Sequence, residues 1–98
     1  QLGALEAAHD QRLLDKENEY IVLYQLLMRA EAPYKAAKVI DYGITEEFVE
    51  ENEKHLKYLA QAWHLSQELG KAEPVYKKAA EKAWEEEQNN QLKKNKGS

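Results

Sequence analysis

The sequence predicts an all-α protein in which antiparallel helix pairs stack into a solenoid, and two observations carry this prediction. The first is composition: 43% of the 98 residues are hydrophobic and 33% are charged, with many Ala, Leu, Glu, Lys and Gln, which favour helices. The second is an internal repeat, because a set of large and small residues recurs 36 positions further along the chain. Repeats of this length are typical of stacked helix pairs.

The repeated set defines a candidate core. Large residues would fill the space between helices, and small ones would let two helices approach closely. A half copy, Leu5 and Ala8, precedes the two complete copies. The first complete copy is Tyr20, Leu23, Tyr24, Leu27, Ala36, Ile40 and Gly43, and the second is Leu56, Leu59, Ala60, Trp63, Ala72, Tyr76 and Ala79.

Five helices are expected, near residues 2–10, 16–30, 33–43, 47–69 and 71–90, with no strand. The first is indicated by the stripe of Leu2, Leu5, Ala8 and His9, in which His9 is interpreted as a packing or surface residue. It would be the second helix of a repeat whose first helix is missing, so the chain is expected to be a fragment or a processed product. The second helix has an apolar stripe from Tyr20 onward, with Asp15 as its expected N-cap.

Break residues separate the later helices. Pro33 suits the first position of the third helix, and Gly43 is expected to end that helix in the C′ position. Thr45 would cap the fourth helix, Gly70 would end it, and Pro74 would fall in the first turn of the fifth. The resulting division is a helical repeat domain over 1–92, made of a half repeat 1–14, repeats 15–44 and 45–83 and a helical extension 84–92, followed by a disordered tail 93–98.

Several function classes are disfavoured by composition. The net charge of −4 argues against nucleic-acid binding, which needs a basic face. There is no Cys, no Ser beside a His at a strand turn and no Gly-rich phosphate loop, so no catalytic constellation and no cofactor are predicted. No apolar run approaches the 18 or so residues of a membrane span.

An acidic cluster before the fourth helix admits two interpretations. It could hold a metal or a basic partner, or it could be a solvated helix start favoured by the helix dipole. The second is preferred, and no metal site is predicted, because neither His55 nor His64 has a Glu three residues before it. The cluster comprises Glu46, Glu47, Glu50, Glu51 and Glu53.

With these residues in view, the chain resembles tetratricopeptide repeats over about residues 2–83. More narrowly, residues 32–40 (APYKAAKVI), with 12–19 and 59–63, resemble repeats of bacterial tetratricopeptide proteins associated with TonB-type energy-transduction systems. The resemblance implies a periplasmic location and a right-handed superhelix. It also implies a non-enzymatic scaffold for protein–protein interaction, whose first helices line a concave groove for a peptide or a partner's helix.

Carried over by position, the groove would use residues that the core pattern leaves unused. Tyr24 departs from the repeat pattern, which prefers a small residue there, so the first helix pair is expected to be splayed. Ile21 and Gln25 replace part of the Lys/Asn clamp of repeats that bind chaperone C-terminal carboxylates, so that ligand is not predicted. The partner-binding residues would be Asn18, Ile21, Gln25, Met28, Arg29, Lys54, Lys57, Gln61, His64 and Leu65.

A second function class remains open. The chain could be a structural or oligomerisation segment of a larger repeat array, without a ligand of its own. Leu2 and Leu5 would have an uncovered apolar side, so homo-oligomers through the repeat ends are expected.

Overall fold

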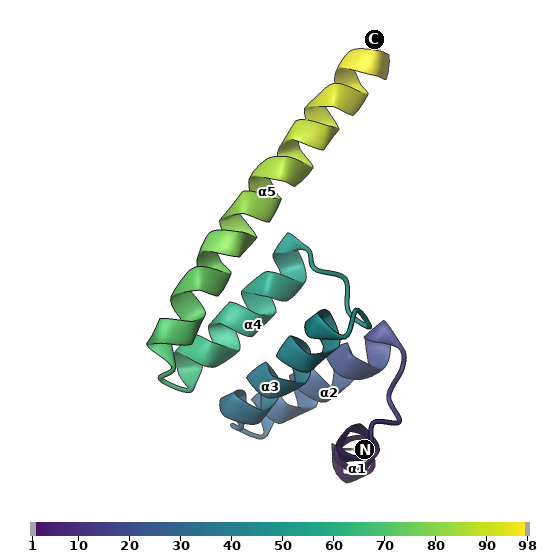
Figure 1. Ribbon diagram of the computed structural model, residues 1–98, viewed down its shortest axis with the longest axis vertical. Helices are drawn as coiled ribbons and strands as arrows, with labels where there is room; N and C mark the ends of the chain where they lie inside the picture. Colours follow the sequence, from purple (N-terminus) through teal and green to yellow (C-terminus); the bar gives the residue numbers. More distant parts are fainter. Residues whose placement is uncertain (1, 98) are drawn as a thin grey trace.

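The computed structural model describes residues 2–97, with side chains up to Lys93. Within this range the protein is all-helical, as predicted. Four helices, α2 to α5, follow one another in antiparallel order, whereas α1 lies across them and is seen nearly end-on (Figure 1). The elements are α1 (Leu2–Asp10), α2 (Glu17–Arg29), α3 (Pro33–Thr45), α4 (Glu53–Leu65) and α5 (Leu69–Gly97).

The core follows the repeated set of residues. Every member of both copies is buried except Tyr76, which is 44% exposed. Burying this many apolar side chains supplies the main driving force for folding. The largest fully buried side chains are those of Tyr20, Leu23, Leu27, Ile40, Leu56 and Val49.

All four helix ends that are followed by another helix share one backbone geometry, and it does not involve glycine. At the end of α2, for example, Glu31 has φ 58°, its N–H donates to Met28 O (3.1 Å), and the N–H of Ala32 donates to Leu27 O (2.9 Å). This is the Schellman arrangement, which satisfies the last carbonyls of a helix. The residues with positive φ are Arg12, Glu31, Glu47 and Gln67.

The expected glycine breaks are therefore wrong. Gly43 lies inside α3, which continues to Thr45, and Gly70 lies inside α5, which begins at Leu69. Thr45 is the last residue of α3 and not a cap of the next helix. Backbone hydrogen bonds close these turns at non-glycine residues, a feature that residue type alone does not reveal.

Two helix starts also differ from expectation. α4 begins only at Glu53, because Asn52 is its N-cap and accepts the His55 N–H at 2.8 Å. The acids before it lie in the connecting segment, so the acidic helix start expected from residue 47 is wrong. At α2 the backbone N–H groups of Asp15 and Lys16 donate to the Glu19 side chain, at 3.2 and 3.1 Å, and Asp15 is not the cap.

α5 is longer than the sequence indicates. It projects well beyond α4 (Figure 1) and gives the protein extents of 51 × 28 × 21 Å. Pro74 lies in its second turn and not its first. Residues 93–97 continue the helix where a tail was expected, while Gln1 and Ser98 lie outside the described residues. None of the helices in the described range is both long and apolar enough to span a membrane.

Candidate protein-interaction groove

The ten predicted groove residues lie on α2 and α4, five on each helix. Eight of them are exposed. The exceptions are Ile21 and Met28, which are half-buried and pack against the core. On α2 the accessible part of the predicted surface is therefore polar, and it consists of Asn18, Gln25 and Arg29.

Tyr24 joins the two helices that carry these residues. Its hydroxyl donates to the Tyr58 carbonyl of α4 at 2.9 Å, and the two rings stack with centroids 5.0 Å apart. Burial, with Tyr58 and Tyr76 nearby, raises the pKa of Tyr24 to about 12. Tyr24 was expected to splay the first helix pair because its ring is large. In the structure this ring reaches from α2 to α4 and contacts Tyr58 there.

A second link fixes the N-terminal ends of the same helices. The Glu17 carboxylate at the start of α2 accepts the Glu50 N–H at 2.9 Å. The buried His55 ring places Nδ1 2.8 Å from the Glu50 carbonyl oxygen and 3.6 Å from Glu17 Oε1. Because a carbonyl oxygen can only accept, Nδ1 is assigned as the protonated nitrogen. α2 and α4 are thereby connected at their N-terminal ends and near their middles.

An open cleft of about 480 Å³ lies between α4 and α5. Two predicted groove residues, Lys57 and Gln61, line it together with residues that the sequence analysis did not propose. Lys57 forms a 2.8 Å ion pair with Glu53, and the His64 ring meets the Tyr76 ring edge-on with centroids 6.4 Å apart. The full lining is Glu53, Lys57, Gln61, Tyr76, Ala79 and Ala80.

The lining of this cleft combines an apolar floor with a polar edge. Tyr76 and the two alanines offer an apolar floor, while Lys57 and Gln61 supply hydrogen-bond donors at its edge. Sequence reasoning placed Tyr76 in the core because it shares a repeat position with Ile40. The signal that could have identified the cleft is the adjacent pair Ala79-Ala80, which is one helical turn beyond Tyr76 and on the same face.

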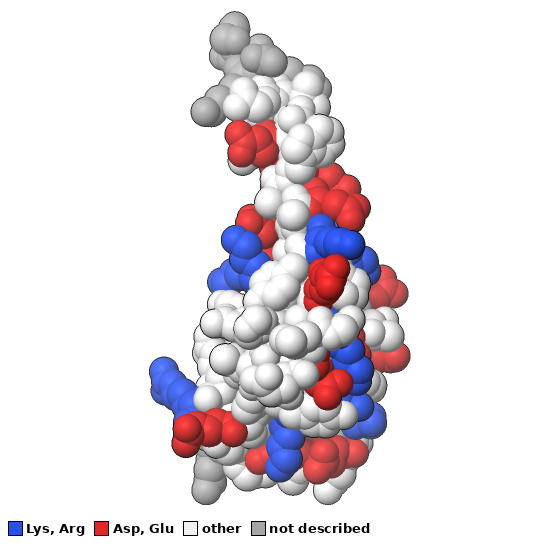
Figure 2. Space-filling model, turned by 90° about the vertical axis from the view of Figure 1, so that its left-hand side faces the viewer, with Lys and Arg blue, Asp and Glu red and all other residues white. Residues whose placement is uncertain are grey.

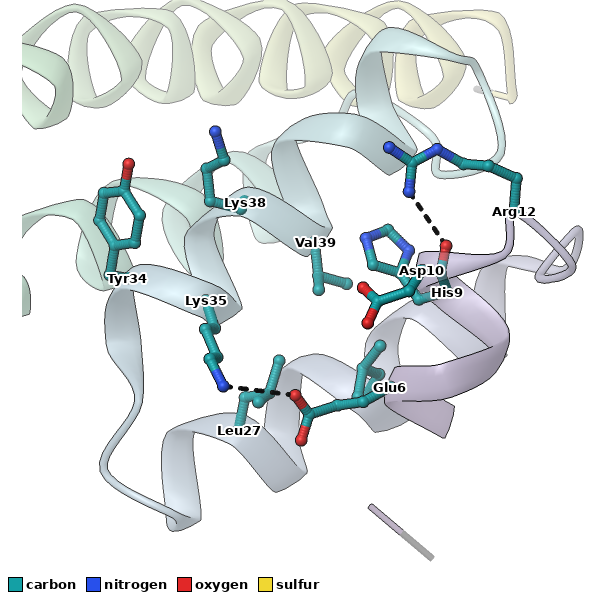
Figure 3. A pocket seen from close by; sticks show the side chains of 10 residues that line it. Glu6, His9, Asp10, Arg12, Leu27, Tyr34, Lys35, Lys38 and Val39 are labelled. Carbon is teal, nitrogen blue, oxygen red and sulfur yellow. Dashed lines mark hydrogen bonds and ion pairs between the residues drawn. The ribbon is translucent and has the colours of Figure 1, made fainter. Parts of the chain in front are cut away.

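A second cleft, of about 380 Å³, opens between α1 and α3 (Figure 3). Leu23, Leu27 and Val39 form its floor. Its polar rim carries three cations and two carboxylates, and only Lys35 and Glu6 form an ion pair, at 3.5 Å. The rim is composed of Glu6, His9, Asp10, Arg12, Tyr34, Lys35 and Lys38.

His9 and Arg12 shape one end of this second cleft. The Arg12 guanidinium donates to the His9 carbonyl at 3.0 Å and lies 4.6 Å from the centroid of the Tyr42 ring. Burial, together with the charge of Arg12, lowers the pKa of His9. The buried Nδ1 of His9 has no hydrogen-bond partner among the described residues. Within the described part of the chain, no group of three or more acidic or imidazole side chains could hold a metal.

Comparisons with protein-family models, with curated proteins and with solved structures find no match to this chain.

Proposed function

We propose that this protein is a non-enzymatic scaffold that binds a partner peptide or helix on the surface of α2 and α4 and in the adjoining cleft between α4 and α5. The observation that carries the proposal is the cleft between α4 and α5, which places an exposed aromatic ring beside Lys57 and Gln61. An exposed ring in a concave site, with a few polar groups at its edge, is the usual composition of a peptide anchor point.

The proposed architecture is a tetratricopeptide-like solenoid of two and a half repeats. Its support is the pairing of α2 with α3 and of α4 with α5, and the burial of nearly all repeat positions. The association with a bacterial TonB-type or envelope assembly, and hence a periplasmic location, rests on the sequence resemblance.

Charge on the surface indicates the kind of partner. Arg29 and Lys54 are exposed and, among the described residues, make no ion pair, whereas Lys57 is held by Glu53. Exposed cations of this kind steer acidic partners and set binding orientation. We therefore expect a peptide that offers an apolar side chain to Tyr76 and acidic residues to α2 and α4.

The alternative is a structural segment that assembles through its ends and has no ligand of its own. Exposed apolar side chains away from the groove favour it, notably Leu13, Trp84 and Leu92. In that case the groove surface would tolerate charge reversal without any loss of association.

The test uses peptides selected from a random displayed library on the purified chain. Binding of a selected, labelled peptide would be measured by fluorescence anisotropy for wild type and for Arg29→Glu with Lys57→Glu. We expect at least a tenfold loss of affinity, because the exposed cation on α2 and the cation that lines the cleft both become negative. The matched control is Lys16→Glu with Lys77→Glu, which reverses two exposed cations outside the groove.

Retention of full affinity in the groove variant would exclude this surface as the binding site. Selection of no binding peptide, combined with self-association that survives both variants, would favour the structural alternative.

A further inference from the structure

The projecting part of α5 carries an apolar side chain set among acids. Trp84 is 66% exposed, and Glu81 and Glu87 flank it one turn before and one turn after, on neighbouring positions of the same helix face. Both glutamates are exposed, and among the described side chains neither pairs with a cation within 4 Å. Figure 2 shows acidic side chains along this narrow part of the protein.

The rim of the cleft between α1 and α3 carries three cations and two carboxylates, so positive charge is in excess there. The floor of the cleft is apolar, Tyr34 on its wall is 47% exposed, and Lys38 has no carboxylate partner within ion-pair distance in the described range. Arg12 likewise makes no ion pair among the described residues, whereas Lys35 is paired with Glu6 and Asp10 is the second carboxylate of the rim. The rim therefore carries one net positive charge, in a protein whose net charge is −4. Among the described residues, the buried Nδ1 of His9 also has no hydrogen-bond partner.

These two surfaces complement each other but cannot meet within one chain. α5 is a single continuous helix that runs away from α1, so its projecting end and the α1–α3 cleft lie at opposite parts of the molecule (Figure 1). A tryptophan flanked by acids fits an apolar cleft with an aromatic wall and a basic rim, because the ring is removed from water while opposite charges meet at the edge.

We propose that the α1–α3 cleft is a docking site for the α5 projection of a second copy of this chain. Trp84 of one copy enters the cleft of the other, with Glu81 and Glu87 facing the cationic rim of Arg12, Lys35 and Lys38. Two copies exchange their α5 projections about a two-fold axis, so the interface is isologous and the same contact is made twice. This surface is distinct from the proposed peptide groove on α2 and α4.

The first measurement is the self-association constant of the full chain, by sedimentation equilibrium at micromolar concentrations. We expect wild type to dimerise, and Trp84→Ala to weaken the dimer at least about tenfold, because buried tryptophan anchors dominate interface energies. The dimer should also weaken at high salt, since exposed charges are then screened. Circular dichroism would verify that the variant keeps its helices.

Charge exchange identifies the two surfaces involved. One variant carries Lys35→Glu and Lys38→Glu, and the other carries Glu81→Lys and Glu87→Lys. Each alone places like charges at both contacts and should be monomeric. Their equimolar mixture should dimerise, because one contact is then wild-type and the other is fully reversed. Lys38→Glu alone, which leaves the Lys35–Glu6 ion pair intact, covers the case in which the double variant is unstable.

Three results would overturn the proposal. These are a monomeric wild type throughout the concentration range, an unchanged dimer in Trp84→Ala, or a mixture of the charge variants that stays monomeric. An unchanged dimer in Trp84→Ala would instead point to stacking through the Leu2 and Leu5 side of α1.

Discussion

Gly43 sets how closely α3 approaches its neighbours, although the sequence suggested that it would end the helix. A Cβ at this position would lie 2.7 Å from Val49 Cγ2 and 3.2 Å from Tyr20 Cδ1. Val49 is buried and β-branched, so it cannot turn away without strain. The absence of a side chain is therefore a packing requirement and not a conformational one.

We expect Gly43→Ala to destabilise the fold by about 1–3 kcal/mol, the usual cost of overpacking a core. Gly70→Ala is the matched control, because it is also helical but has no atom within 4 Å of the added Cβ. That substitution should be neutral or stabilise by up to about 1 kcal/mol. Urea unfolding of both variants measures the difference, and equal midpoints would contradict the packing argument.

Tyr24 should make the stability of the fold decrease at alkaline pH. Its pKa is about 12 in the folded state and about 10 in an unfolded chain, so the unfolded state releases its proton first. The stabilising contribution is fully present below pH 10 and is lost as pH rises through 12, and it amounts to at most about 3 kcal/mol. Burial also raises the pKa of Tyr20, which acts in the same direction.

Tyr24→Phe should reduce the fall in stability between pH 10 and 12, and should cost about 0.5–1.5 kcal/mol near neutrality for the lost hydrogen bond. Denaturant titrations at several pH values would measure both effects. Tyr34→Phe, at an exposed ring, is the control. If the free energy of unfolding fell as steeply between pH 10 and 12 in Tyr24→Phe as in wild type, Tyr24 would not be the source of the pH dependence.

At the scale of the helix, the ends are set by backbone closure at residues that carry a Cβ. A left-handed conformation costs a non-glycine residue on the order of 1 kcal/mol, and the four positions with this conformation all bear long side chains. Because no glycine marks these positions, the helix boundaries were the least predictable part of each helix.

Glu31→Gly should therefore stabilise the protein by about 0.5–1 kcal/mol, since glycine adopts φ 58° without strain. Glu31→Ala separates the loss of charge from the change in backbone freedom and should bring no such gain. Ala30→Gly, at φ −81°, should destabilise instead. Thermal unfolding of the three variants orders them, and a lower melting temperature for Glu31→Gly would refute the explanation.

For the whole molecule, the core residues could be predicted because burial in stacked helices repeats with the helix pair. Exposure of Tyr76 could not, because it depends on what covers α5 on the side that α4 leaves open. The cleft between α1 and α3 could not be predicted from the sequence either, because it depends on the direction in which α1 crosses the other helices. Eight of the ten predicted groove residues are exposed, whereas Ile21 and Met28 are half-buried because α2 packs them against the core.

The α5 projection should contribute little to the stability of the core. Its described side chains from Trp84 to Lys93 are all exposed. At concentrations where the chain is monomeric, truncation after Ala83 should therefore change the free energy of unfolding by less than about 0.5 kcal/mol. The far-ultraviolet helical signal should fall in proportion to the helix removed. A non-cooperative or much weaker unfolding transition would show that the projection supports the core.

The two tryptophans occupy opposite environments, and this gives the protein two separate optical reporters. Trp63 is 5% exposed and lies beneath the Lys71 ammonium group, with Nζ 4.6 Å from the ring centroid, whereas Trp84 stands in solvent. A small aqueous quencher should therefore extinguish the red-shifted emission of Trp84 and leave the emission of Trp63. Protection of the first component would then report contact at α5, while a shift of the second would report opening of the core.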